Sequence, residues 1–297
     1  MSDSIFQYVS DEHRLVLPTG EVLWDTAILP DFAEHFLGID IGRVWQDLLA
    51  LPTHPVDQDI AIGDGRDPKW IPGAHPALNY RGRAVKRDKI WAQSGYDAGL
   101  SRYGYTGWQW DVAGGTVRVD ALPGLDAIAT AVNATLGLEH PHNNWIVTRY
   151  GSGADNIGFH SDKTKDFRPG SCFVVIKCGQ PRRFEFSWDE DAIVAARARV
   201  KQCEKATEGV AEARAALRAA TKGRQYPEVF FSRVLSAGTA VIVGTAANLR
   251  VKHGVPPIEG EGDAGENHVS GSIVGRCIDT VVDWDVVKKR RVGRPSK

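Results

Sequence analysis

The sequence predicts an α+β protein, mainly β, with a mostly antiparallel β-sandwich or jelly roll at its centre. From residue 116 onward, short β-branched or aromatic runs recur, separated by Gly, Pro or Asn. Two stretches instead have helical character, one by the spacing of its apolar residues and one by its alanine content. A chain of 297 residues with 42% apolar side chains is large enough to bury such a core.

The elements follow in chain order. Residues 1–77 contain many prolines and a helix candidate at 32–51, so we expect an N-terminal extension whose helices pack on the core. Between 122 and 137 apolar residues have helical spacing, and Gly137 is a suitable C-terminal stop. The predicted strands span 116–119, 145–150, 171–180, 182–188, 229–244 and 270–278.

The stretch 192–221 is rich in alanine and long charged residues, which favour helix. Acidic residues precede it and basic residues end it, as a helix dipole prefers, and Gly209 predicts a break between two helices. We therefore expect a helical insertion at 191–224 within a domain that spans 78–284. A basic tail at 285–297 follows this domain.

Composition excludes several classes of protein. No apolar run approaches the ~18 residues that a membrane span needs, and the first residues lack the pattern of a secretory signal. The four cysteines form no CxxC pair and are too few for a disulfide scaffold. We therefore expect an intracellular monomer without a membrane partner, cytoplasmic or, in a eukaryote, nuclear.

The segment RYGSGADNIGFHSDKTKDF contains a metal-ligand pattern. His160 and Asp162 are two residues apart, so on an extended strand both side chains leave the same face. A second histidine, His253, follows another predicted strand. Two histidines and one carboxylate form the facial ligand set of non-haem Fe(II) sites. A buried histidine hydrogen-bonded to an aspartate is the simpler alternative.

Arg276 lies on a later predicted strand among apolar neighbours. Iron(II) oxygenases that use 2-oxoglutarate must hold a distal carboxylate, and an arginine fork does so with paired, charge-assisted bonds. The alternative is an arginine at the surface or rim of the core.

Several motifs, in the right order, resemble the AlkB family of Fe(II)/2-oxoglutarate nucleic-acid dealkylases. The most specific match is NWIVTRYGSGADNIGFHSDKTKDFRPGSCFVVIKCGQPRRFEF. Upstream, YDAGLSRYGYTGWQW is similar to the segment that carries aromatic residues toward the target base, and TAVIVGTAANLRVKHGVPP resembles the surroundings of the third iron ligand. The resemblance covers roughly residues 78–280, without the helical insertion.

The resemblance implies a double-stranded β-helix (jelly-roll) core and a dioxygenase that uses Fe(II), 2-oxoglutarate and O2. His160, Asp162 and His253 would bind the iron and form the catalytic centre. Arg276 matches the second arginine of the family's R-x-N-x-x-x-R segment, and Tyr150 matches its 2-oxoglutarate-contacting tyrosine. The expected reaction is oxidative dealkylation or hydroxylation of a nucleic-acid base, as in DNA repair by demethylation, with release of succinate and CO2.

The chain departs from the family's pattern in the expected 2-oxoglutarate pocket and in the expected substrate pocket. Ser270 and Ser272 stand where the family has its first arginine and an asparagine, and Thr148 replaces a frequent asparagine. The 2-oxoglutarate pocket is therefore expected to keep Arg276 and to be rebuilt with hydroxyls. Thr164 occupies a position where the family often has an acid facing the base, which disfavours cationic methylated adenine or cytosine.

Aromatic residues in SRYGYTGWQW are candidates for the substrate pocket. Tyr103 and Tyr105 share one alternation of the chain, Trp108 and Trp110 the other, and aromatic faces stack on bases. The two tyrosines match aromatic positions of the family, and Trp108 is a third candidate. Packing in the core is the alternative for each.

The formal net charge of −1 conceals an uneven distribution. Residues 81–89, 192–224 and 285–297 carry net charges of +4, +5 and +5, which favours nucleic acid as a partner. The acidic loop 258–266 would instead repel a phosphate backbone. Two alternatives stay open: the same chemistry on a small molecule, nucleoside or protein side chain, and a non-catalytic binding module.

Overall fold

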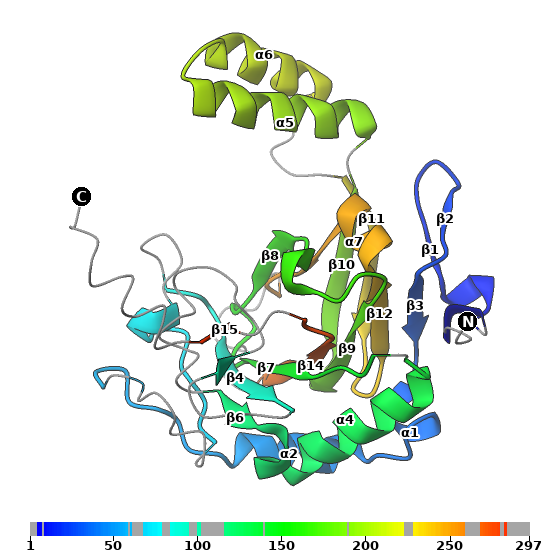
Figure 1. Cartoon of the computed structure of the whole chain (residues 1–297), viewed down its shortest axis with the longest axis vertical. Coiled ribbons are helices and arrows are strands. Elements are labelled where there is room, and N and C mark those ends of the chain that lie inside the picture. The colour runs from blue at the N-terminus through cyan, green and yellow to red at the C-terminus, as the bar shows by residue number, and fades with distance from the viewer. Residues whose placement is uncertain are drawn as a thin grey trace.

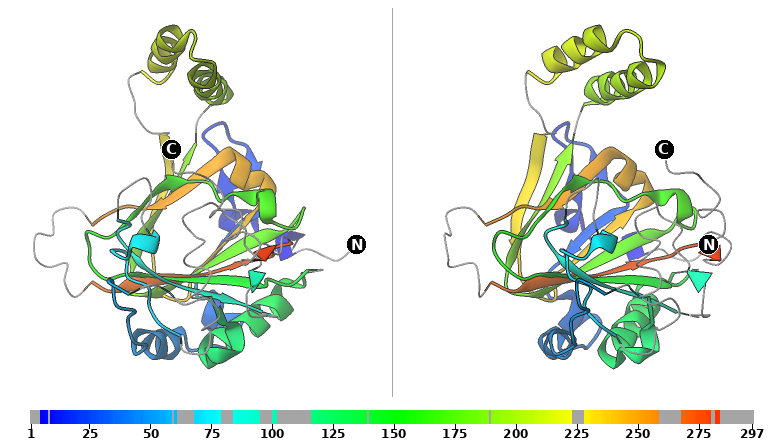
Figure 2. Two further views of the ribbon diagram at one scale, coloured as in Figure 1. Left: turned by 60° about the vertical axis from the view of Figure 1, so that its left-hand side comes forward. Right: turned by 90° about the vertical axis from the view of Figure 1, so that its left-hand side faces the viewer.

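Two β-sheets face each other in the computed structural model (Figures 1 and 2). The structure describes residues 5–7, 9–58, 60, 68–78, 84–94, 100–101, 116–138, 140–188, 190–222, 228–258, 268–279 and 282–283. The strands are β1 (Leu15–Val16), β2 (Val22–Leu23), β3 (Thr26–Leu29), β4 (Asp88–Gln93), β5 (Leu100–Ser101), β6 (Val117–Arg118), β7 (Asn144–Tyr150), β8 (Ile157–His160), β9 (Cys172–Gly179), β10 (Arg182–Trp188), β11 (Glu228–Leu235), β12 (Ala240–Gly244), β13 (Val251–Val255), β14 (Ser270–Arg276) and β15 (Val282–Asp283). The α-helices are α1 (Phe32–His35), α2 (Ile41–Leu49), α4 (Pro123–Leu136), α5 (Asp191–Ala206), α6 (Val210–Ala220) and α7 (Thr245–Arg250).

The larger sheet has seven strands in the order β3-β12-β9-β14-β7-β4-β6, and its pairs are antiparallel except for β4 with β6. The smaller sheet has four antiparallel strands in the order β11-β10-β13-β8. This mixed α/β architecture is consistent with the predicted jelly roll, although the described strands do not close into a barrel.

The central strands of the larger sheet are buried on both faces. In β9, Val174 and Ile176 pack in one cluster with residues of α2 and α4, whereas Phe173 and Val175 pack with residues of the smaller sheet. Successive side chains of a strand point to opposite faces, so a strand covered on both sides carries a nearly continuous apolar run. Helices α2 and α4 thus cover one face of the larger sheet (Figure 1), and the other face lies toward the smaller sheet.

Two predicted elements are divided in the structure. The helix expected at 32–51 forms α1 and α2, separated at Gly38, whose φ of 65° ends the first helix. The carboxylate of Asp40 then accepts a hydrogen bond from the backbone N–H of Arg43 and begins α2. The strand expected at 229–244 is divided at a turn containing Gly238 (φ 86°), and its halves enter different sheets.

The alanine-rich stretch forms a hairpin of α5 and α6, with Gly209 (φ 65°) at the break. The hairpin is inserted between β10 and β11, which are paired with each other in the smaller sheet. It stands away from both sheets at the top of Figure 1. Within the described ranges, no helix is both long and apolar enough to cross a bilayer.

Candidate metal centre and its cavity

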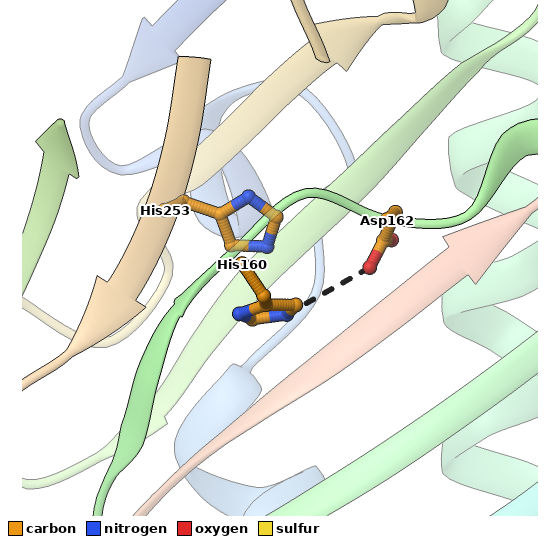
Figure 3. Close-up of side chains that lie close together, drawn as sticks. All are labelled: His160, Asp162 and His253. Carbon is orange, nitrogen blue, oxygen red and sulfur yellow. Dashed lines mark ion pairs between the residues drawn. The ribbon is translucent and has the colours of Figure 1, made fainter. Parts of the chain in front are cut away.

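Strand pairing brings the two histidines together. His160 is the last residue of β8 and lies opposite His253 of β13, with ring centroids 4.3 Å apart. The chain then leaves the strand, and Oδ1 of Asp162 lies 3.8 Å from Nε2 of His160 (Figure 3). One ligand atom from each of these residues lies within 4.8 Å of the others. The triad predicted from the sequence is therefore assembled in space.

Hydrogen bonds orient two of the three ligands. Nδ1 of His160 lies 2.9 Å from the carbonyl oxygen of Gly158, an arrangement in which Nδ1 carries the proton and Nε2 keeps its lone pair for a metal. The Asn248 side chain makes two hydrogen bonds to the backbone of Asp162. Its Oδ1 accepts from the Asp162 N–H at 2.9 Å, and its Nδ2 donates to the Asp162 carbonyl at 2.8 Å.

The charge state of the triad suits a divalent cation. Burial raises the pKa of Asp162, but the nearby charge of Arg276, the two histidines and the hydrogen bond from Arg276 together outweigh this effect, and the pKa falls to about 2. Arg276 donates from Nε and Nη2 to Oδ2 of this carboxylate, at 2.9 and 2.8 Å. Burial lowers the pKa of His253 to about 3 and also lowers that of His160. Two neutral imidazoles and one carboxylate are the form in which these groups bind metal.

The donor set fits non-haem Fe(II). Two imidazoles and one carboxylate occupy one side of the ion and leave positions open for other ligands. Phe184 stacks on the His253 ring at 5.9 Å with an interplanar angle of 7°, and Phe173 and Phe186 lie within 6.2 Å of the same ring. Among the described residues, no other group of three His, Cys, Asp or Glu side chains has this arrangement.

The triad opens into a cavity of about 290 Å³ between the two sheets. The cavity is unusually basic. Its lining includes the cationic side chains Arg87, Lys89, Lys163, Lys177 and Arg276, whereas Asp162 supplies the only acidic side chain among the described lining residues. A cavity with this excess of positive charge favours an anionic ligand.

The predicted 2-oxoglutarate residues fall into two groups. Thr148, Tyr150, Ser272 and Arg276 line the cavity together with the triad. Ser270 is fully buried at the start of β14, opposite Tyr150 in the sheet, and does not line the cavity.

Of the four predicted substrate residues, the structure describes only Thr164. Thr164 begins a short 3-10 turn and is not part of the lining. Tyr103, Tyr105 and Trp108 lie outside the described residues.

Four residues around the cavity were missed by the sequence reasoning: Arg87, Lys89, Lys177 and Asn248. Lys177 left a signal, because it is a single charged residue inside the otherwise apolar run CFVVIKCG. Lysine is almost never fully buried without a special reason. Arg87 and Lys89 lie in the basic stretch 81–89, whose charge did not indicate a cavity, and Asn248 has no comparable local signal.

No family model matches the chain, and no curated protein does. Among solved structures, OsALKBH1 has a TM-score of 0.43 and 16% identity, over 85% of this chain and 96% of that chain. A prolyl hydroxylase from Trichoplax adhaerens, in complex with a peptide fragment of the hypoxia inducible factor oxygen degradation domain, has a TM-score of 0.40 and 9% identity. That match covers 91% of this chain and 88% of the other. Since both TM-scores are below 0.5, neither likeness carries an inference about this chain.

Proposed function

We propose that this chain is an Fe(II)- and 2-oxoglutarate-dependent dioxygenase whose two facing sheets form a double-stranded β-helix. The observation that carries the proposal is the His160–Asp162–His253 triad at one end of a basic cavity. The triad supplies three metal ligands, and the cationic lining suits a dianionic co-substrate. Neither feature alone would be as specific as their combination.

Different side chains orient the proposed metal ligands and exclude water from them. Arg276 engages Oδ2 of Asp162, which leaves Oδ1 directed toward His160. The aromatic rings around His253 keep water from that side of the metal site. When bound, iron(II) with 2-oxoglutarate and O2 supplies the oxidising chemistry, in which a substrate C–H bond is hydroxylated and succinate and CO2 are released.

For the substrate, we propose a base in a nucleic acid that is dealkylated or hydroxylated. Support comes from the motifs that resemble the AlkB family and from the aromatic segment that contains Tyr103, Tyr105 and Trp108. The three basic stretches of the sequence add a source of affinity for phosphates. Hydroxylation of an N-methyl carbon would release it as formaldehyde and restore the base.

A hydroxylase of a small molecule, a nucleoside or a protein side chain is the second candidate. Thr164 stands where an acid would face a cationic base, and the acidic stretch 258–266 follows soon after His253. This candidate predicts weak, salt-insensitive affinity for oligonucleotides. A nucleic-acid enzyme instead loses affinity steeply as salt is added.

The test is a turnover assay with methylated oligonucleotides, nucleosides and free metabolites, read by mass spectrometry as gain of oxygen or loss of a methyl group. Succinate formation should require iron and 2-oxoglutarate and should be lost in His160→Ala. Full succinate formation by that variant, or without iron, would contradict the proposal. Binding of metal and 2-oxoglutarate without any turnover would favour a non-catalytic binding module.

A further inference from the structure

Lys177 lies in a polar row that crosses four strands of the larger sheet. The register aligns Lys89 of β4 with Thr148 of β7, Thr148 with Ser272 of β14, and Ser272 with Lys177 of β9. All four residues line the cavity. Neighbouring strands are about 4.8 Å apart, so the two lysine Cα atoms are separated by about 14 Å across the row.

The ammonium group of Lys177 is buried and has no counter-ion among the residues that the structure describes. The residue is 1% exposed, and its Nζ has no hydrogen-bond partner in the described part of the chain. It lies 5.7 Å from the centre of the Tyr150 ring. Burying an unpaired charge costs free energy. A buried ammonium group beside a cavity is therefore expected to pair with an anionic ligand that binds there.

The other cations of the cavity are differently engaged. Arg276 donates to the metal-site carboxylate of Asp162, and Arg87 donates from Nη1 to the carbonyl of Asn156 at 3.2 Å. Nζ of Lys89 lies 5.3 Å from the centre of the Trp91 ring, on the same strand β4. Lys177 is therefore the buried cation best placed to meet the remote end of an anion bound at the triad.

The identity of residue 270 also favours Lys177 for this role. The position where the resemblance would put a first arginine holds Ser270, which has no charge and does not line the cavity. Lys177 lies in the adjacent strand, in the row of Ser272. Ser272 and Arg276 are four positions apart on β14, so about 13 Å of strand separates that row from the row of Arg276.

We propose that Lys177, with the hydroxyls of Thr148 and Ser272, binds the distal carboxylate of 2-oxoglutarate. This proposal rests on the proposed function and replaces the distal-carboxylate role that the sequence analysis expects of Arg276. Arg276 instead positions the metal ligand Asp162. The lysine of β9 and the arginine of β14 thus hold opposite ends of one site, which selects 2-oxoacids that carry a second carboxylate.

The test compares two ligands that differ only in that carboxylate. Calorimetry on the full chain loaded with Mn(II), without O2, would measure the affinities for 2-oxoglutarate and 2-oxobutyrate. The wild-type chain should prefer 2-oxoglutarate. Lys177→Met should lose roughly 10- to 100-fold in affinity for 2-oxoglutarate, as expected for a lost charge-assisted hydrogen bond, and should bind 2-oxobutyrate unchanged. Lys177→Arg should recover part of the preference.

Lys89→Met is the matched control, because it removes a positive charge from the other end of the same row. It should keep the preference for 2-oxoglutarate, and equal losses in both methionine variants would overturn the proposal. Mn(II) affinity and thermal unfolding of each variant without 2-oxoacid show whether it is folded. If Lys177→Met does not fold, Lys177→Gln carries the same test.

The two proposals fail in different ways. A wild-type preference for 2-oxoglutarate that persists in Lys177→Met would overturn the role of Lys177 and leave the dioxygenase standing. Failure of the Mn(II)-loaded wild-type chain to bind either 2-oxoacid would overturn both.

Discussion

At the scale of single residues, Asp162 depends on side chains from distant parts of the chain. Asn248 exchanges two hydrogen bonds with its backbone, and Arg276 holds one of its carboxylate oxygens. Ligands that lie in a loop after a strand need such contacts to keep their direction, because the sheet no longer fixes the backbone there. The metal site therefore extends beyond its three ligands.

Replacing Asn248 tests this dependence. We expect Asn248→Ala to weaken Mn(II) binding by roughly 10- to 100-fold, because the backbone of Asp162 loses both of its side-chain partners. A titration followed by electron paramagnetic resonance measures the affinity. Leu249→Ala is the control, since Leu249 is the next residue of α7 and is 76% exposed. Equal affinities in the two variants would show that Asn248 does not position the ligand.

The pH dependence of 2-oxoglutarate binding tests the state of Lys177. Burial lowers the pKa of Lys177 to about 8. Near Lys177, burial raises the pKa of Cys178 to about 12 and also raises that of Tyr150. Both groups therefore stay neutral near pH 8, and Arg182 stays charged. Above pH 8 the Lys177 amine is mostly uncharged and must gain a proton when the carboxylate of 2-oxoglutarate binds. The affinity for 2-oxoglutarate should therefore fall by up to about tenfold per pH unit.

Calorimetry of the Mn(II)-loaded chain between pH 7 and pH 9.5 would give this profile. Lys177→Arg should flatten it, because guanidinium does not lose its proton in this range. A profile that is the same in both proteins would assign the pH dependence to another group.

At the scale of elements, the larger sheet and α2 pack closely through glycines. A Cβ added to Gly271 of β14 would lie 2.2 Å from Cη2 of Trp45, and one added to Gly179 of β9 would lie 2.6 Å from Nε1 of the same ring. Trp45, Trp70 and Trp145, three of the nine tryptophans of the chain, are buried and pack in the core. The strands that carry Lys177 and Ser272 are thereby held against the helix.

Gly271→Ala should destabilise the protein by about 1–3 kcal/mol, because the added methyl group must displace Trp45 or the strand. Chemical denaturation measures the change in the free energy of unfolding. Gly158→Ala in β8 serves as the control, since its Cβ would meet no atom within 4 Å. Similar stabilities of the two variants would argue against tight packing of α2 on this sheet.

At the scale of the whole molecule, the α5–α6 hairpin is separate from the metal centre. No residue of the hairpin lines the cavity, and the strands on either side of it, β10 and β11, pair along their length. We therefore expect the hairpin to be dispensable for assembling the cavity, although it lies between two paired strands of the smaller sheet in the sequence.

Replacing residues 191–222 with a short Gly/Ser linker should leave the affinities for Mn(II) and 2-oxoglutarate unchanged. The same variant of the full chain can be tested for binding to an oligonucleotide, where a loss confined to this ligand would give the hairpin a role with the partner. Loss of metal affinity in a folded variant would show that the hairpin supports the site after all.

The local pattern of the sequence was sufficient for several features. Recurring β-branched and aromatic runs predicted a mainly β protein, and the HxD spacing with a later histidine predicted a His160–Asp162–His253 cluster, which the structure assembles. The break at Gly209 was also readable, because a glycine between two alanine-rich stretches is a local signal. The HxD pair and the helix break depend on residues close together in the chain, whereas His253 was matched to the pair through its place after a predicted strand and through the family resemblance.

The partners of side chains were decided only by the tertiary structure. Residues 89, 148, 177 and 272 share one row because four strands pair in a particular register, and Arg276 faces Asp162 because β14 ends beside the loop after β8. Side-chain alternation along a strand is a local property, whereas the register between strands depends on packing across the whole core. The sequence alone thus predicted the candidate metal ligands, and the fold decided which charges surround them.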